Sequence, residues 1–240
     1  MQLLRSAQTW IVAAVLSLLF GFLFLQQLED FIGIQDQLAQ QDYPVGLSGY
    51  MSVRYLQPLA VAFTFVAALF AMRSFSDEFR QNTYALWQAS PVSHTTLVVG
   101  KFTGLSLVML LLIVLAVGIL IIMRFFVPID IPVVLSSALG LVLCSCTATA
   151  CGMFFSSLTK QTLVAIISSL ALLVLLWLVG SANFAELPIQ GIRQFSIATH
   201  LSGFFQGYLQ LADFAYFMLM TIAFLALSII RLDALRQNGY

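Results

Sequence analysis

Apolar residues dominate the chain in six long runs, and short polar segments separate them. A helix needs about 20 mostly apolar residues to cross a hydrocarbon core roughly 30 Å thick. We therefore predict membrane spans near residues 10–28, 56–72, 96–123, 132–155, 163–182 and 214–230. Runs such as LSLVMLLLIVLAVGILIIM are apolar on every face, whereas strands of a membrane β-barrel alternate apolar and polar residues. The pattern predicts an all-α integral membrane protein with six transmembrane helices in one domain, residues 1–240.

Composition agrees with this pattern, because 61% of the 240 residues are hydrophobic and only 8% are charged. Soluble globular domains carry far more charge. The formal net charge is zero and there is no basic stripe, which argues against nucleic acid as a partner. The segments 29–55 and 183–212 are predicted to be outer loops. The longer stretches between spans stay below the roughly 40 residues that an unaided domain needs, so no separate catalytic domain is expected.

Lysine and arginine positions indicate the orientation, because they collect in cytoplasmic segments. If both termini are inside, seven basic residues fall on inner segments: Arg5, Arg73, Arg80, Lys101, Lys160, Arg231 and Arg236. The remaining three fall outside: Arg54, Arg124 and Arg193. This bias predicts that both termini are cytoplasmic.

The segment 73–95, between the second and third predicted spans, concentrates charge in a chain that has little. Ser76 is a candidate N-cap, and Asp77 and Glu78 would then occupy the first turn, where the positive helix end favours anions. Pro91 would end the helix about four turns later. We therefore predict a cytoplasmic helix in this segment.

The predicted helix is amphipathic, with one apolar face that comprises Phe79, Thr83, Leu86 and Trp87. Such a helix can rest on lipid headgroups, or it can dock on a soluble partner. The third span begins early, near Thr95, so its Lys101 end should project into the cytoplasm. The residues alone leave both alternatives open.

The run DEFRQNTYALWQASPVSHTTLVVGKF resembles the cytoplasmic signature of type 2 ABC exporter permeases. The matching positions are Asp77, Glu78, Thr83, Leu86, Ser90, Pro91, Gly100 and Lys101. Asn82 and Ala85 depart from the glycine and the acidic residue that are usual there. The end of the chain is similar to the gliding-motility and nitrous-oxide-reductase-maturation branch, at His200, Phe204, Gly207, Asp213, Arg231 and Arg236.

The resemblance implies a permease subunit of an ATP-driven exporter in a bacterial inner membrane. It also implies a second permease copy, surrounding membrane lipid and a separate ABC ATPase subunit as partners. The chain has no phosphate-binding loop, since Thr95 stands where the first glycine would be and Phe102 follows Lys101. We therefore expect a non-enzyme that binds no cofactor, with ATP bound by the partner. In this family the segment 183–212 would form a re-entrant hairpin rather than an interfacial loop.

The coupling contacts implied by the resemblance comprise Asp77, Glu78, Phe79, Arg80, Thr83, Leu86, Trp87, Ser90, Pro91, Gly100 and Lys101. Phe79, Leu86 and Trp87 would be apolar anchors for the ATPase. Glu78 and Arg80 would set partner choice by charge complementarity. On this interpretation, Glu78→Lys should prevent co-purification of the ATPase.

An intramembrane serine protease of rhomboid type is the alternative function, because Gly46-Leu47-Ser48-Gly49 matches G-x-S-G and His200 is available. However, Ser48 falls in a predicted outer loop and His200 lies well before the last span. A short motif of this kind is weak.

The three cysteines, Cys144, Cys146 and Cys151, lie in the fourth predicted span. On a helix, Cys144 and Cys151 share a face and Cys146 points nearly opposite. We expect close packing of small residues there rather than a metal site. The transported substrate has no recognisable motif.

Overall fold

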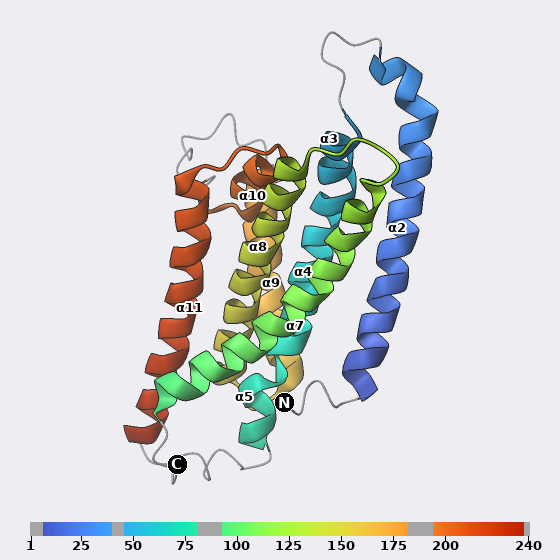
Figure 1. The fold of residues 1–240 in the computed structure, drawn as a ribbon. Helices are drawn as coiled ribbons and strands as arrows, with labels where there is room; N and C mark the ends of the chain where they lie inside the picture. Colours follow the sequence, from blue (N-terminus) through green and yellow to red (C-terminus); the bar gives the residue numbers. More distant parts are fainter. Residues whose placement is uncertain (1–6, 40–45, 81–92, 182–193, 238–240) are drawn as a thin grey trace.

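The fold is a bundle of long helices (Figure 1). The computed structural model describes residues 7–39, 46–80, 93–181 and 194–237. Its helices are α2 (Ala7–Ala39), α3 (Leu47–Met51), the π-helix η1 (Ser52–Leu56), α4 (Gln57–Ala71), α5 (Arg73–Arg80), α7 (His94–Met123), α8 (Ile131–Leu158), α9 (Thr162–Ser181), α10 (Ile197–Phe205) and α11 (Leu211–Gln237). Six helical segments are long and apolar enough to cross a membrane, and no strand occurs in the described ranges. The predicted all-α architecture with six spans is confirmed.

Helix α8 is the centre of the bundle and contacts α4, α5, α7, α9, α10 and α11. Small residues permit this density, because they let helix backbones approach closely in a membrane. A Cβ on Gly152 would lie 2.6 Å from the Ala71 Cβ, and one on Gly140 would lie 2.8 Å from the Phe204 Cβ. The small-residue packing predicted for this span is therefore present.

The cysteines of α8 face different neighbours. The Cys144 sulfur lies 3.6 Å from the Thr64 hydroxyl of α4, whereas the Cys146 sulfur lies 3.9 Å from the Ser106 hydroxyl of α7. The helical spacing thus directs the two thiols to different helices, as the sequence predicted. Cys151 is buried.

Helix α2 lies at the edge of the bundle (Figure 1). It is fixed by aromatic contacts, because Phe20 packs on Phe63 and Phe24 packs edge-on against Tyr55. Much of the rest of its surface is exposed and apolar, including Leu18, Phe22 and Leu25. α2 therefore leaves an apolar face outside the contacts of a single chain.

Two segments predicted as loops contain helices. In 29–55, α2 continues to Ala39, and α3 and η1 lead directly into α4. In 183–212, α10 begins after Ser196, whose hydroxyl accepts the Thr199 N–H. Polar residues end an apolar run without ending a helix, because their side chains can be solvated while the backbone stays hydrogen-bonded. An apolar run therefore locates a span more reliably than it locates the ends of the helix.

Candidate functional site

Helix α5 follows α4 after a bend at Met72 and lies at the same end of the bundle as the start of α2 and the end of α11 (Figure 1). It begins at Arg73, so Ser76 is not its N-cap, and Asp77 and Glu78 are not in its first turn. Ser76 is fully buried, and its hydroxyl donates to the Met72 carbonyl of the preceding turn. The predicted cap is wrong because serine can also bond back to a carbonyl four residues earlier.

The acceptor that caps α5 comes from α8 instead. Ser156 Oγ accepts the N–H groups of Phe75 and Ser76, each at 3.0 Å, and donates to the Met72 carbonyl at 2.7 Å. These bonds use the one donor and two acceptor positions of the hydroxyl. The first N–H groups of a helix lack partners within the helix, so Ser156 satisfies two of them. The bend between α4 and α5 is therefore held by a third helix.

Lys101 of α7 makes the second connection to α5. Its Nζ lies 2.6 Å from Glu78 Oε1 and donates to the Ser74 carbonyl. The same ammonium group lies 4.2 Å from the centre of the Phe75 ring, within cation–π range. Lys101 and Glu78 are each 22% exposed. The sequence predicted that Glu78 contributes charge to a partner, whereas in the structure its ion pair with Lys101 lies within the chain.

Asp77 makes the third connection, because its Oδ1 accepts the Thr162 hydroxyl at 3.0 Å at the start of α9. Phe79 is only 5% exposed and packs in a cluster with other buried apolar residues: Ala71, Phe75, Leu97, Val98, Leu105, Met153 and Leu232. Its side chain thus stabilises the junction of α5 with the spans. The prediction that Phe79 is an apolar anchor for a partner is corrected accordingly.

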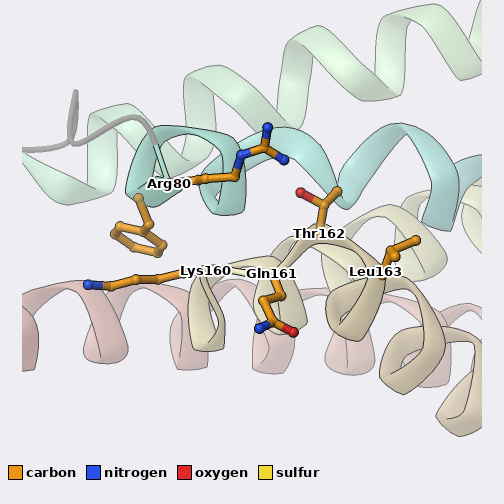
Figure 2. Close-up of a pocket in the computed structure, with 6 residues that line it drawn as sticks. Arg80, Lys160, Gln161, Thr162 and Leu163 are labelled. Carbon is orange, nitrogen blue, oxygen red and sulfur yellow. The ribbon is translucent and has the colours of Figure 1, made fainter.

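A cavity of about 450 Å³ lies between α5 and the turn from α8 to α9. Its lining comprises Phe79, Arg80, Lys160, Gln161, Thr162 and Leu163. Figure 2 shows Arg80 on α5 and Lys160 and Gln161 on the neighbouring turn, with their side chains pointing in different directions. Arg80 and Lys160 are both exposed. The end of α5 therefore borders a basic cavity that is open to the surroundings.

Residues 1–234 match the profile of the family described as ABC-2 family transporter protein. The chain belongs to the ABC-2 transporter family. It is a multi-pass membrane protein and the permease component of an ABC transporter, and this component is not itself catalytic. Comparison with curated proteins found no significant match.

The permease brings together only part of the predicted coupling set. Asp77, Glu78, Phe79, Arg80 and Lys101 gather around α5, and Gly100 lies exposed on α7 with open space beside it. Thr83, Leu86, Trp87, Ser90 and Pro91 lie outside the described residues. Sequence reasoning missed Ser156 and Thr162, since a serine or threonine near the end of a span carries no pattern that names its partner.

The first turn of α7 ties the permease to its last span. Ser93 caps α7 by accepting the Thr96 N–H at 3.2 Å. His94 Nδ1 lies 2.7 Å from Asp233 Oδ1 of α11. The first residue of α7, directly after the coupling segment, is thus attached to α11.

The two residues of the protease alternative engage other groups. The Ser48 hydroxyl donates to Asp130 Oδ2 at 3.1 Å. His200 uses both ring nitrogens, since Nδ1 lies 2.6 Å from Asp213 Oδ1 and Nε2 lies 2.8 Å from the Gln194 carbonyl. A nucleophilic serine needs a base within hydrogen-bond reach, and His200 does not provide it here. The arrangement does not form the dyad that the motif predicted.

Proposed function

We propose that this permease couples ATP hydrolysis by a separate ABC ATPase subunit to movement of a substrate across a bacterial inner membrane. Family membership implies association with an ABC ATPase. The observation that supports the coupling route is the attachment of α5 to three other helices, through Lys101 of α7, Ser156 of α8 and Thr162 of α9. Segment 73–95 is the part of the chain that receives the ATPase.

Because α5 is attached to three other helices, it can transmit a movement of the coupling segment to them. Its bonds and its buried Phe75 and Phe79 side chains join it to three spanning helices at one end of the bundle. Close-packed interiors pass on strain rather than absorb it. A movement imposed on segment 73–95 by closure of the ATPase would therefore reach α7, α8 and α9 together. Leu86 and Trp87, beyond the end of α5, remain the proposed apolar anchors.

If α5 lies on the cytoplasmic side, where it would meet the ATPase, both chain ends also lie in the cytoplasm. The start of α2 and the end of α11 lie at the end of the bundle that carries α5 (Figure 1). A second permease copy is the proposed neighbour of the exposed apolar face of α2. Substrate would pass along the seam between the copies, and the direction of transport is proposed to be export.

We further place the permease near the gliding-motility and nitrous-oxide-reductase-maturation branch. His200 and Asp213, which carried that resemblance, form a hydrogen bond. Phe204 of α10 is buried against Gly140 of α8, and Gly207 adopts a positive φ of 81° in the turn that follows α10. These residues therefore act together to place α10, which supports a shared motif rather than chance matches.

Co-purification of the ATPase with tagged full-length permease tests the proposal. Trp87→Ala should reduce retention of the ATPase by roughly thirtyfold, since an interface anchor contributes about 2 kcal/mol or more. Phe126→Ala is the matched control, because Phe126 is an aromatic residue, 81% exposed, three residues after the end of α7. That end of α7 lies at the end of the bundle away from α5 (Figure 1). Both variants should elute as folded permease. Full retention of the ATPase by Trp87→Ala would instead favour a helix that rests on lipid headgroups.

A further inference from the structure

The imidazole of His200 lies between two acceptors near the start of α10. Its Nδ1 is 2.6 Å from Asp213 Oδ1 of α11, and its Nε2 is 2.8 Å from the carbonyl oxygen of Gln194. A carbonyl oxygen cannot donate a hydrogen bond, so Nε2 must carry a proton. A second proton must lie between Nδ1 and the carboxylate, whichever of the two atoms holds it. The geometry therefore requires two protons on the His200–Asp213 pair.

Loss of one of these protons leaves a single hydrogen for two contacts, because a neutral imidazole has one N–H group. A hydrogen bond to an ionised carboxylate is stronger than one to a neutral carbonyl. The remaining proton therefore stays on Nδ1, beside Asp213. The bare Nε2 would then face the Gln194 carbonyl with a lone pair. The contact with Gln194 is thus the one that loss of a proton breaks.

Helix α11 also holds residues 194–195 by a separate bond. The Tyr216 hydroxyl donates to the Phe195 carbonyl at 2.6 Å, and the Tyr216 ring stacks on His200 with 4.2 Å between centroids. A cation over the face of a tyrosine ring is attracted to it, so the stack favours the charged imidazole. These contacts join residues 194–195, α10 and α11 in one cluster, in which the Gln194 contact is available only to the protonated pair.

Other ionisable groups on the elements packed against α10 are engaged away from His200. The Cys144 sulfur of α8 faces the Thr64 hydroxyl of α4, and Asp130, directly before α8, accepts a hydroxyl of α3. Helix α9 contains no charged residue. In η1, the Tyr55 hydroxyl bonds to a carbonyl of α7, and Arg54 is exposed and forms no salt bridge with the described residues. Asp213 and Tyr216 are therefore the ionisable groups that contact the ring in the described part of the chain.

We propose that His200 is a proton-sensitive latch, which holds residues 194–195 to α10 when the His200–Asp213 pair carries its second proton. The protonated pair is the closed form, so the Gln194 contact is complete at low pH and is lost as the pH rises. Helix α10 lies at the end of the bundle away from α5 (Figure 1). On the proposed orientation, the latch therefore responds to pH outside the membrane. This placement rests on the proposed function, whereas the chemistry of the latch does not.

Hydrogen exchange of the full-length permease in detergent tests the latch from about pH 5 to about pH 8, where histidine side chains change charge. Rates are corrected for the intrinsic pH dependence of exchange. Protection of residues 194–199 should fall roughly tenfold as the pH rises, because a hydrogen bond to a charged group contributes about that factor or more. His200→Gln should lack this response. His94→Gln, which removes the histidine–aspartate pair at the other end of α11, is the matched control and should keep it. Constant protection in the wild type would overturn the proposal.

Asp213→Asn separates the latch from simple loss of a buried contact. An asparagine amide at position 213 can donate to Nδ1 of a neutral imidazole, so Nε2 keeps its N–H for the Gln194 carbonyl. Both contacts are then made without a second proton on the ring. Protection of residues 194–199 should therefore stay at its acid value up to about pH 8. Low protection at both ends of the range would contradict the latch, because it would show that the carboxylate acts only as a structural contact.

Nitrogen-15 NMR of the imidazole locates the protons directly. The chain has two histidines, so His94→Gln leaves His200 as the single imidazole when the permease is purified without a polyhistidine tag. Both ring nitrogens should carry hydrogen at about pH 5, and only Nδ1 should carry it at about pH 8. Hydrogen retained on Nε2 at the higher pH would overturn the latch. None of these measurements involves the ATPase, so their failure would leave the coupling proposal standing.

Discussion

Glu78 and Lys101 form an ion pair of 2.6 Å between α5 and α7. Both residues belong to the signature that resembles exporter permeases, although nothing in the sequence pattern predicts that they pair. The pair joins the segment proposed to meet the ATPase to a 30-residue spanning helix. The signature therefore includes contacts that attach the coupling segment to the permease itself.

Exchange of the two charges tests this connection. Glu78→Lys and Lys101→Glu should each destabilise the permease, because each places like charges together in a partly buried site. The double exchange should recover part of the loss, with a coupling energy of about 1 kcal/mol or more. Recovery will be incomplete, since a glutamate at position 101 cannot donate to the Ser74 carbonyl or face the Phe75 ring. Thermal unfolding in detergent measures all three variants, and additive effects would contradict the pairing.

Loss of the Ser156 hydroxyl should loosen α5 specifically. Ser156→Ala leaves the Phe75 and Ser76 N–H groups without their acceptor from α8, at a cost of about 1–3 kcal/mol. Hydrogen exchange should then become faster at residues 73–80. Ser168→Ala is the matched control, because the Ser168 hydroxyl bonds to carbonyls of its own helix. If residues 73–80 exchange at the same rate in both variants, Ser156 does not contribute to the proposed coupling route.

The spans could be predicted because each one depends on its own apolarity. The residues that hold α5 could not, because Ser156 and Thr162 are far from it in the chain and reach it only after the helices pack. Ser76 illustrates the difficulty, since its hydroxyl can cap a helix or bond to the preceding turn, and burial against α8 decides between them. Likewise, the amphipathic pattern indicated that Phe79 seeks an apolar surface. It did not say that the surface is the permease's own.

Gly152 should be intolerant of even one added carbon. Gly152→Ala would place a Cβ 2.6 Å from the Ala71 Cβ, so α4 and α8 must separate. Overpacking of this kind costs about 1–3 kcal/mol. Gly104→Ala is the control, because Gly104 is exposed and a Cβ there meets nothing within 4 Å. A lower unfolding temperature is expected for Gly152→Ala alone, and equal temperatures would show that the helices can adjust.

The contact of His200 with Asp213 should hold α10 against α11. The imidazole lies between Asp213 Oδ1 and the Gln194 carbonyl, and its ring stacks on Tyr216 with 4.2 Å between centroids. His200→Ala removes all three contacts, and hydrogen bonds to charged groups contribute about 1.5–3 kcal/mol. Amide protection in residues 197–205 should therefore fall by roughly tenfold or more. His94→Ala, which removes the other histidine–aspartate pair at the opposite end of α11, should leave that protection unchanged. Because α10 is remote from α5, His200→Ala should retain the ATPase, and loss of the ATPase with this variant would show that the contact supports the whole fold.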